Sequence, residues 1–343
     1  MRVSANQITL LRIVLLPLPL FLFYGGPTSR MIGLFILLAL GLTDYLDGLL
    51  ARRYGSTPLG KLLDPIADKI FIAVAFVPLA EMGILPMWII WPIFFREFLV
   101  TEMRRFARPD AKGLKVTELA KVKTTLQMVG VGLILLTDTF PDRYITIAFL
   151  AGLLVATVFL AVTVYFRSGG ITERLKVALI FEAAGLVIAL ALKAHHANLV
   201  YGIIIVGITL VSGYQYAAAA LPGILGRGLP AAFELLLSIA CPLTALGFLP
   251  FVEDRERLWV VLVLAAEFAV QGLDMWAIME GKRDLSRFRK FLLSPFVLML
   301  LASAFLGLVG PIWALRIYAF LISIYLMADI WVHRQLFAKG DIF

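Results

Sequence analysis

The feature that most restricts the fold of this chain is a series of apolar runs, each about 20 residues long, that recurs along its whole length. A helix of about 20 residues crosses a hydrocarbon core of about 30 Å. Of the 343 residues, 61% are hydrophobic and only 16% are charged, whereas a soluble domain carries about 25% charged residues. The sequence therefore predicts an all-α polytopic membrane protein.

Hydropathy predicts about twelve spanning helices. Their centres fall near residues 16, 40, 75, 93, 128, 155, 184, 208, 239, 268, 299 and 323. The first apolar run contains Arg12 and lacks a convincing small-residue cleavage site, so we expect a spanning helix there and not a cleaved signal peptide.

Lysine and arginine gather in loops that would share one side of the membrane. The basic stretches are 52–61, 104–123, 167–176, 282–290 and 334–339. The positive-inside rule places these loops and both termini in the cytoplasm. We therefore expect an integral multi-pass protein of the cytoplasmic (inner) membrane whose net charge of +8 lies on one face and meets anionic membrane lipids. Nucleic-acid binding is not expected, because no soluble basic domain is present to hold a duplex.

The loop RSGGITER, residues 167–174, divides the chain into two halves of about six spans each. We expect one membrane domain over residues 1–167 and a second helical membrane domain over residues 168–343.

Four aspartates stand in one window, TDYLDGLLARRYGSTPLGKLLDPIADK, residues 43–69. Asp44 and Asp47 are three residues apart at the end of one apolar run, and Asp64 and Asp68 are four apart at the start of the next. On helices these spacings place each pair on one face, about 5–6 Å apart. A helical hairpin would bring all four carboxylates together near the cytoplasmic edge, with the active site on that side. Two starts are open for the second helix, since Thr-Pro at 57–58 and Asp-Pro at 64–65 are both capping patterns.

Four carboxylates at this range repel one another, and burying each costs several kcal/mol unless a cation compensates it. Hard oxygen ligands favour Mg²⁺, Mn²⁺ or Ca²⁺ over zinc or copper. Two metals about 3.5–4 Å apart would clamp a phosphoryl transfer. We expect Mg²⁺ or Mn²⁺ as the cofactor. A paired or snorkelling charge is the simpler reading for a single intramembrane aspartate, but four at these spacings disfavour it.

The other polar and small residues of the window suit a phosphate site. Gly48 and Gly60 let a ligand or a second helix approach the backbone, and Ala51 keeps that face open. Arg52 offers a planar fork of donors for phosphate.

Written out, the window resembles the signature of the CDP-alcohol phosphotransferase family: Asp44-x-x-Asp47-Gly48-x-x-Ala51-Arg52, then Gly60-x-x-x-Asp64-x-x-x-Asp68. The resemblance implies a six-helix membrane bundle, usually a homodimer, in which an alcohol hydroxyl attacks the β-phosphorus of a CDP-linked lipid and CMP leaves. It further implies that all four aspartates bind metal and that Asp68 is also the general base. The residues that it assigns to the CDP-lipid site in this window are Gly48, Ala51, Arg52 and Gly60.

Two further stretches resemble the phosphatidylglycerophosphate synthases within that family. The Asn-x-x-Thr-x-x-Arg pattern of Asn6, Thr9 and Arg12 would border the nucleotide. For Arg12 a snorkelling interfacial arginine is the alternative.

The second stretch, residues 94–128, contains the Arg96-Glu97 pair and a Lys-x-Lys-Thr-x-x-Gln run. Its cations Arg104, Lys121 and Lys123 would bind the phosphate of an acceptor, although positive-inside topology alone also places basic residues there. Ala120 stands where these synthases usually have glycine, and the loop 107–119 lacks their small-residue run.

The resemblance covers residues 1 to about 167 and implies transfer of a phosphatidyl group from CDP-diacylglycerol to glycerol 3-phosphate, in phospholipid biosynthesis. Sister transferases that use inositol phosphate, serine or phosphatidylglycerol are alternatives. A cation-coupled transporter is another, which the interleaved glycines and arginine disfavour.

After residue 171 no motif identifies a family. Four carboxylates fall inside apolar segments, and such residues are by default functional candidates: Glu182, Glu234, Glu267 and Asp329. Pairing with neighbours such as Tyr214, Arg316 or His333 is the alternative. A scaffold, a lipid-handling module and a transporter are open for this half, and the scaffold is favoured because no catalytic constellation is visible.

Overall fold

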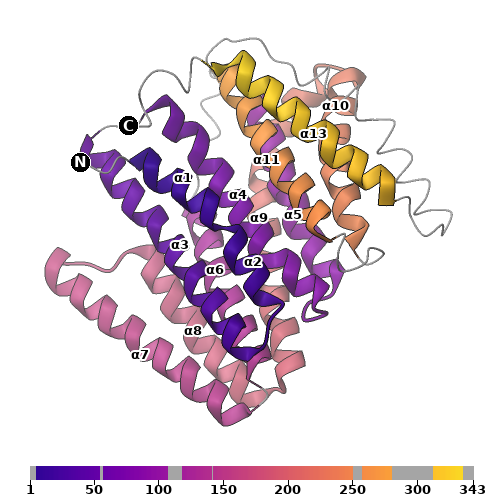
Figure 1. Ribbon diagram of the computed structural model, residues 1–343. Coiled ribbons are helices and arrows are strands. Elements are labelled where there is room, and N and C mark those ends of the chain that lie inside the picture. Colours follow the sequence, from indigo (N-terminus) through magenta and orange to yellow (C-terminus); the bar gives the residue numbers. More distant parts are fainter. Residues whose placement is uncertain are drawn as a thin grey trace.

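The computed structural model describes residues 5–54, 57–106, 118–140, 142–249, 257–279 and 312–334. Within these ranges all regular elements are helices (Figure 1). They are α1 (Ala5–Leu15), α2 (Pro17–Phe23), α3 (Pro27–Tyr54), α4 (Pro58–Glu81), α5 (Met87–Phe106), α6 (Glu118–Thr139), α7 (Arg143–Ser168), α8 (Glu173–Ala191), α9 (Ala194–Leu225), α10 (Leu229–Gly247), α11 (Arg257–Met279) and α13 (Ile312–Val332). The predicted all-α class is confirmed.

Ten of the twelve predicted centres fall inside a described helix, and the centre near 299 lies outside the described residues. The centre near 16 falls where α1 gives way to α2, because Pro17 has no backbone N–H with which to continue α1. The two helices still form one apolar stretch, Asn6–Phe23, of 18 residues.

Six stretches of the described residues are long and apolar enough to cross a membrane. They are Asn6–Phe23, Arg143–Arg167, Ala194–Leu225, Leu229–Gly247, Leu258–Ile278 and Ala314–Val332. The chain is thus an integral multi-pass membrane protein. Helices α4, α5 and α6 are not among the six, and these helices carry most of the charged residues of the candidate site.

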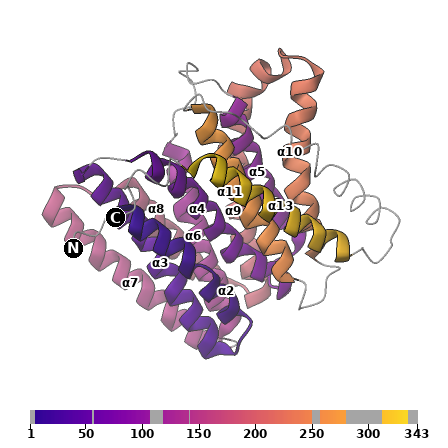
Figure 2. The same cartoon turned by 45° about the horizontal axis from the view of Figure 1, so that its top comes forward.

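Helices from both halves of the sequence share one hydrophobic core. Helix α9 packs against α5 and α6, α10 packs against α5, and α11 packs against α4. Helices α7 and α8 lie on one side of the molecule and α11 and α13 on the other (Figures 1 and 2). In space, therefore, the helices after residue 168 pack directly on those before it.

The position of α9 depends on small residues that let it approach α5 closely. A Cβ on Gly202 would lie 2.8 Å from Cδ1 of Ile89, and a Cβ on Gly213 would lie 2.8 Å from Cγ of Arg96. Small residues allow such close helix contacts in membranes. Gly202 thus brings α9 against an apolar residue of α5, and Gly213 brings it against Arg96 in the charged part of that helix.

Candidate functional site

The N-terminal parts of α1 and α4 lie side by side and present their polar residues to one another. Thr9 Oγ1 donates a hydrogen bond to Asp64 Oδ1 at 3.1 Å. One turn further along, Arg12 Nη1 lies 3.5 Å from Asp68 Oδ1. Arg12 is buried, with 2% of its side chain exposed, so the snorkelling alternative is wrong for this residue.

The first turn of α4 explains how Asn6 and Gly60 meet. Thr57 is the N-cap of α4, because its Oγ1 accepts a hydrogen bond from the backbone N–H of Gly60 at 3.0 Å and Pro58 follows it. The same hydroxyl donates to Asn6 Oδ1 at 3.0 Å. A Cβ on Gly60 would lie 2.8 Å from that oxygen, so glycine here admits the approach of α1. Of the two predicted starts of this helix, Thr-Pro at 57–58 is the correct one.

Several predicted site residues have side chains outside the described part of the structure. Asp44, Asp47, Gly48, Ala51 and Arg52 lie on the last turns of α3, whose backbone is helical to Tyr54, and Lys121 lies near the start of α6. The meeting of the four carboxylates is therefore still a prediction. Among the side chains that the structure describes, no group of three or more His, Cys, Asp or Glu residues could hold a metal ion, and only Asp64 and Asp68 of the four aspartates are included.

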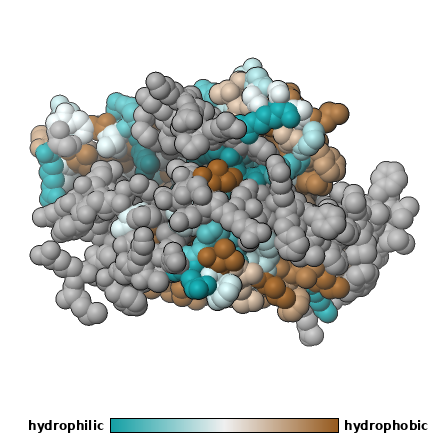
Figure 3. All heavy atoms as spheres, turned by 90° about the horizontal axis from the view of Figure 1, so that it is seen from above, coloured by the Kyte–Doolittle hydropathy of each residue, from teal (hydrophilic) through white to brown (hydrophobic). Residues whose placement is uncertain are grey.

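Asp64 and Asp68 open into a cavity of about 290 Å³ that residues of five helices line. Its charged lining residues come from α1, α4, α5, α6 and α8. They are Arg12, Asp64, Asp68, Lys69, Arg96, Glu97, Arg104, Lys123 and Arg174. Six of these side chains are cationic and three are acidic, so the described lining favours anionic ligands. Seen from above, this end of the molecule carries several groups of hydrophilic residues (Figure 3).

Two of the three predicted acceptor cations, Arg104 and Lys123, line this cavity. Lys123 is buried, and its ammonium group donates to Glu97 Oε1. Arg96 Nη1 also donates to Glu97, at 3.3 Å to each carboxylate oxygen. The buried carboxylate thus holds two cations in place at the border between α5 and α6.

Helix α9 supplies partners to these residues that the sequence did not indicate. Ser212 Oγ accepts a hydrogen bond from Arg96 Nη2 at 2.8 Å, and the Tyr216 hydroxyl accepts one from Arg104 Nη2 at 2.9 Å. The Arg104 guanidinium also lies over the Tyr216 ring, 4.9 Å from its centroid. Because α9 reads as an ordinary apolar helix, only its place in the fold reveals these contacts.

Lys69 and Arg174 are two further lining residues that the sequence did not single out for the site. Lys69 directly follows Asp68 and is buried. Arg174 belongs to the basic stretch 167–176, for which the positive-inside rule is sufficient explanation. The spacing of neither residue signals a ligand. Arg174 lies in the first turn of α8 and so comes from the C-terminal half of the chain.

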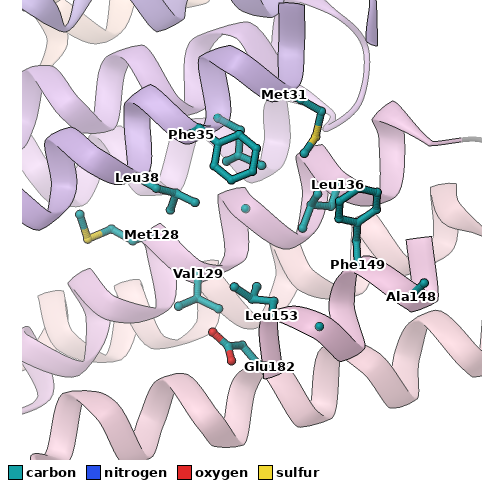
Figure 4. Close-up of a pocket in the computed structure, with 13 residues that line it drawn as sticks. Met31, Phe35, Leu38, Met128, Val129, Leu136, Ala148, Phe149, Leu153 and Glu182 are labelled. Atoms are coloured by element: carbon teal, nitrogen blue, oxygen red, sulfur yellow. The ribbon is translucent and has the colours of Figure 1, made fainter. Parts of the chain in front are cut away.

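A second, apolar pocket of about 450 Å³ adjoins the charged cavity. It lies between α3, α6 and α7, where Phe35, Leu136 and Phe149 surround it (Figure 4). Met128 lines both this pocket and the charged cavity. The two spaces together could accommodate a molecule with a charged head and an apolar chain.

The four carboxylates of the C-terminal half have partners, which agrees with the pairing alternative. Thr157 Oγ1 donates to Glu182 at 3.2 Å, Arg105 Nη2 donates to Glu234 at 2.9 Å, and the Tyr318 hydroxyl donates to Glu267 at 2.6 Å. Asp329 Oδ1 lies 3.2 Å from His333 Nδ1, so His333 is a correctly predicted partner. Glu182 reaches the apolar pocket, where its carboxylate is visible beside Val129 and Leu153 (Figure 4).

Comparisons with known proteins point to one family. The model of the family described as CDP-alcohol phosphatidyltransferase matches residues 2–167. A protein of Mycobacterium tuberculosis named "Probable phosphatidylglycerophosphate synthase" is 37% identical over 183 residues, which is 49% of this chain and 85% of the relative.

Two relatives named CDP-diacylglycerol--glycerol-3-phosphate 3-phosphatidyltransferase match a shorter part of the chain. The protein of Cereibacter sphaeroides is 37% identical over 38% of this chain and 62% of its own length. The protein of Bacillus subtilis is 30% identical over 38% of this chain and 75% of its own length. No solved structure matches this chain.

Proposed function

Because this chain belongs to the CDP-alcohol phosphatidyltransferase family, we propose that it transfers the phosphatidyl group of CDP-diacylglycerol to glycerol 3-phosphate. The products are phosphatidylglycerophosphate and CMP. The chain is an enzyme of the phosphatidyltransferase class, and the names of its relatives support this choice of donor and acceptor.

The observation that carries the proposal is the arrangement of charge around the 290 Å³ cavity. Carboxylates of α4 open into the same space as cations from α5, α6 and α8. The carboxylates can bind the metal of a metal-bound diphosphate and can accept a proton. The cations can bind the phosphate of a second substrate. A reaction between a nucleotide-linked lipid and a phosphorylated alcohol needs both within one cavity.

The carboxylates that are described fit a hard divalent cation. Asp64 and Asp68 both present oxygen ligands to the cavity, and no thiol or imidazole lies among its described lining residues. Together with Asp44 and Asp47, they would hold Mg²⁺ or Mn²⁺. Such a cation, when bound, would neutralise charge on the diphosphate and on the departing CMP.

Asp68 is the residue that we assign as general base. Its side chain is 49% exposed and opens into the cavity, while Arg12 holds one of its oxygens from the protein side. The carboxylate accepts the proton of the acceptor hydroxyl as that oxygen attacks the β-phosphorus and the bond to CMP breaks. A positioned base of this kind contributes about 10²–10⁴ in rate.

Arg104 is the best placed of the proposed acceptor ligands. Lys123 is already bonded to the carboxylate of Glu97, whereas Arg104 bonds through one nitrogen to a neutral hydroxyl. An arginine fork with its remaining donors directed at a phosphate gives a charge-assisted, bidentate contact. Lys121 would add a third cation from the same end of α6.

The apolar pocket beside the cavity suits an acyl chain of the donor. Its position next to Met128 would place the chain between α3 and α6 while the diphosphate lies at the carboxylates. Arg104, Lys123 and Arg174 line the cavity and belong to basic stretches of the sequence. By the positive-inside rule they support a cytoplasmic active site, with both termini on that side of the inner membrane. We propose a homodimer on the family resemblance alone.

One assay tests the proposal: purified protein with CDP-diacylglycerol, Mg²⁺ and a panel of alcohols, scored by release of CMP. We expect release with glycerol 3-phosphate and little with serine or unphosphorylated glycerol. Release of CMP with inositol phosphate alone would favour the sister transferase, which would use the same cations. An absence of release with every acceptor would contradict the transferase function.

A further inference from the structure

Helix α9 contacts residues that line the charged cavity, although it lies outside the residues that the family model matches. It packs between α5 and α6. The cations proposed to bind the acceptor phosphate are carried by those two helices. The C-terminal half of the chain is therefore in direct contact with the acceptor side of the candidate site.

Tyr216 of α9 contacts two arginines of α5. Its hydroxyl accepts a hydrogen bond from Arg104 Nη2 at 2.9 Å. Its ring lies 4.9 Å from the guanidinium carbon of Arg104 and 5.8 Å from that of Arg96. One buried tyrosine thus restrains Arg104 through two different parts of its side chain.

Ser212 of α9 begins a second chain of contacts that ends at Lys123. It accepts from Arg96 at 2.8 Å, Arg96 donates to Glu97, and Glu97 accepts from the ammonium group of Lys123. Gly213, the next residue of α9, leaves the space that the stem of Arg96 occupies. Arg104 is thus held by α9 directly and Lys123 through two intermediate side chains.

Contacts of this kind provide partners for three polar residues at fully buried positions of α9. Thr209, Ser212 and Tyr216 are all buried, and burying a hydroxyl without a partner is costly. Each of them meets a polar side chain of α5 or α6, since Gln127 Nε2 donates to Thr209 Oγ1 at 3.3 Å. The polar face of α9 therefore matches the polar face of the site.

We propose that α9 is part of the acceptor site, and that Tyr216 and Ser212 are positioning residues for the cations that bind the acceptor phosphate. This inference rests on the proposed function. A guanidinium that is free to rotate loses conformational entropy when it binds, whereas one already fixed by a ring and a hydroxyl loses less. The C-terminal half would then set affinity for the phosphorylated acceptor without contacting the reacting atoms.

The test uses point variants of the full chain in detergent. Tyr216→Leu removes both the hydroxyl and the ring, and Tyr216→Phe removes the hydroxyl alone. Ser212→Ala removes the hydroxyl by which α9 bonds to Arg96. Tyr214→Phe is the matched control, since Tyr214 is on the same helix but 73% exposed. The readouts are kcat, the KM of each substrate and the inhibition constant of inorganic phosphate against glycerol 3-phosphate.

We expect Tyr216→Leu to raise the KM of glycerol 3-phosphate and the inhibition constant of phosphate about 10-fold, because a hydrogen bond to a charged group and a cation–π contact are lost. Tyr216→Phe is expected to raise both about 3-fold. The KM of CDP-diacylglycerol should change less than about 2-fold, as should all constants of Tyr214→Phe.

Equal changes in the KM of both substrates, or no change in Tyr216→Phe and Ser212→Ala, would overturn the positioning role. If Tyr216→Leu does not fold, Tyr216→Phe and Ser212→Ala decide the question, because each removes only a hydroxyl. The acceptor assay of the wild-type protein separates failure of the proposed function from failure of the proposed role of α9. If the wild type releases CMP only with another phosphorylated alcohol, the proposed acceptor is wrong, and the same constants measured with that alcohol still test the role of α9.

Discussion

The guanidinium of Arg12 lies 3.5 Å from the carboxylate of Asp68, and the two side chains differ sharply in exposure, at 2% and 49%. The cation is therefore supplied from inside the protein, while the carboxylate opens into the cavity. This arrangement orients Asp68 and leaves the cavity side of its carboxylate accessible to a substrate hydroxyl. It also places a fixed positive charge beside the expected position of the CDP diphosphate.

Replacing Asp68 by asparagine should abolish turnover while CDP-diacylglycerol binding partly persists. The amide keeps the size of the side chain but cannot take a proton from the acceptor, so CMP release should fall by about 10² or more. Release of CMP and titration with the nucleotide lipid measure the two effects separately. Asp138→Asn is the control, because Asp138 pairs with Arg30 at the other end of α6 from Lys123 and should keep nearly full activity. A variant Asp68→Asn with near-normal turnover would contradict the assignment of the base.

Replacing Arg12 should weaken binding of the donor CDP-diacylglycerol more than binding of the acceptor glycerol 3-phosphate. Arg12→Lys keeps the charge but loses the planar fork, and Arg12→Leu loses both, so the two variants should form a graded series. We expect Arg12→Leu to raise the KM of CDP-diacylglycerol about 10-fold, as expected for a lost charge-assisted contact. The KM of glycerol 3-phosphate should stay within about 2-fold, and a larger rise in this second constant would place Arg12 at the acceptor instead.

The helices and one wall of the site could be predicted from the sequence, because both depend on local spacing. Apolar runs place the spanning helices, and the four-residue spacing of Asp64 and Asp68 puts both carboxylates toward one cavity. The contacts of Ser212 and Tyr216 could not be predicted, because their partners lie 116 and 112 residues away. Nor does hydropathy separate a snorkelling arginine from the buried one found at Arg12, since both readings fit the same apolar run.

Filling the apolar pocket should weaken binding of the lipid donor. A Cβ on Gly132 has no atom within 4 Å and Gly132 lines the pocket, so Gly132→Leu adds a side chain to empty space with little strain. If an acyl chain lies there, the KM of CDP-diacylglycerol should rise about 10-fold, since about two methylenes of buried contact are worth that much. Gly207→Leu is the control, because Gly207 is equally uncrowded but lies on α9 and outside the pocket. An unchanged KM in Gly132→Leu, with wild-type thermal stability, would place the acyl chain elsewhere.

Removal of divalent cations should stop the reaction reversibly. Carboxylate oxygens are hard ligands and favour Mg²⁺ or Mn²⁺ over soft metals. EDTA should therefore abolish CMP release, and addition of either cation should restore it. Asp64→Asn should raise the Mg²⁺ concentration needed for half-maximal activity, because one ligand is lost. Full activity after exhaustive chelation would contradict the metal-dependent reading of the aspartates.

Replacing Gly60 by alanine should impair the donor site without unfolding the protein. The new Cβ would come within 2.8 Å of Asn6 Oδ1, so the Asn6 amide must move and its contact with Thr57 is lost. Thermal stability should change little, because alanine has a higher helix propensity than glycine, and this gain of less than about 1 kcal/mol in the first turn offsets part of the lost contact. We expect a rise of about 3-fold or more in the KM of CDP-diacylglycerol, while Gly26→Ala, where a Cβ has no atom within 4 Å, leaves it unchanged.

The double variant Gly60→Ala with Asn6→Ala decides whether the effect passes through Asn6. Residues in contact have non-additive effects, so the KM of the double variant should equal that of Asn6→Ala alone. Additive effects would mean that Gly60 acts on the nucleotide independently of α1. In that case the close approach of Asn6 would be a packing feature, and Gly60 itself would be the residue that faces the ligand.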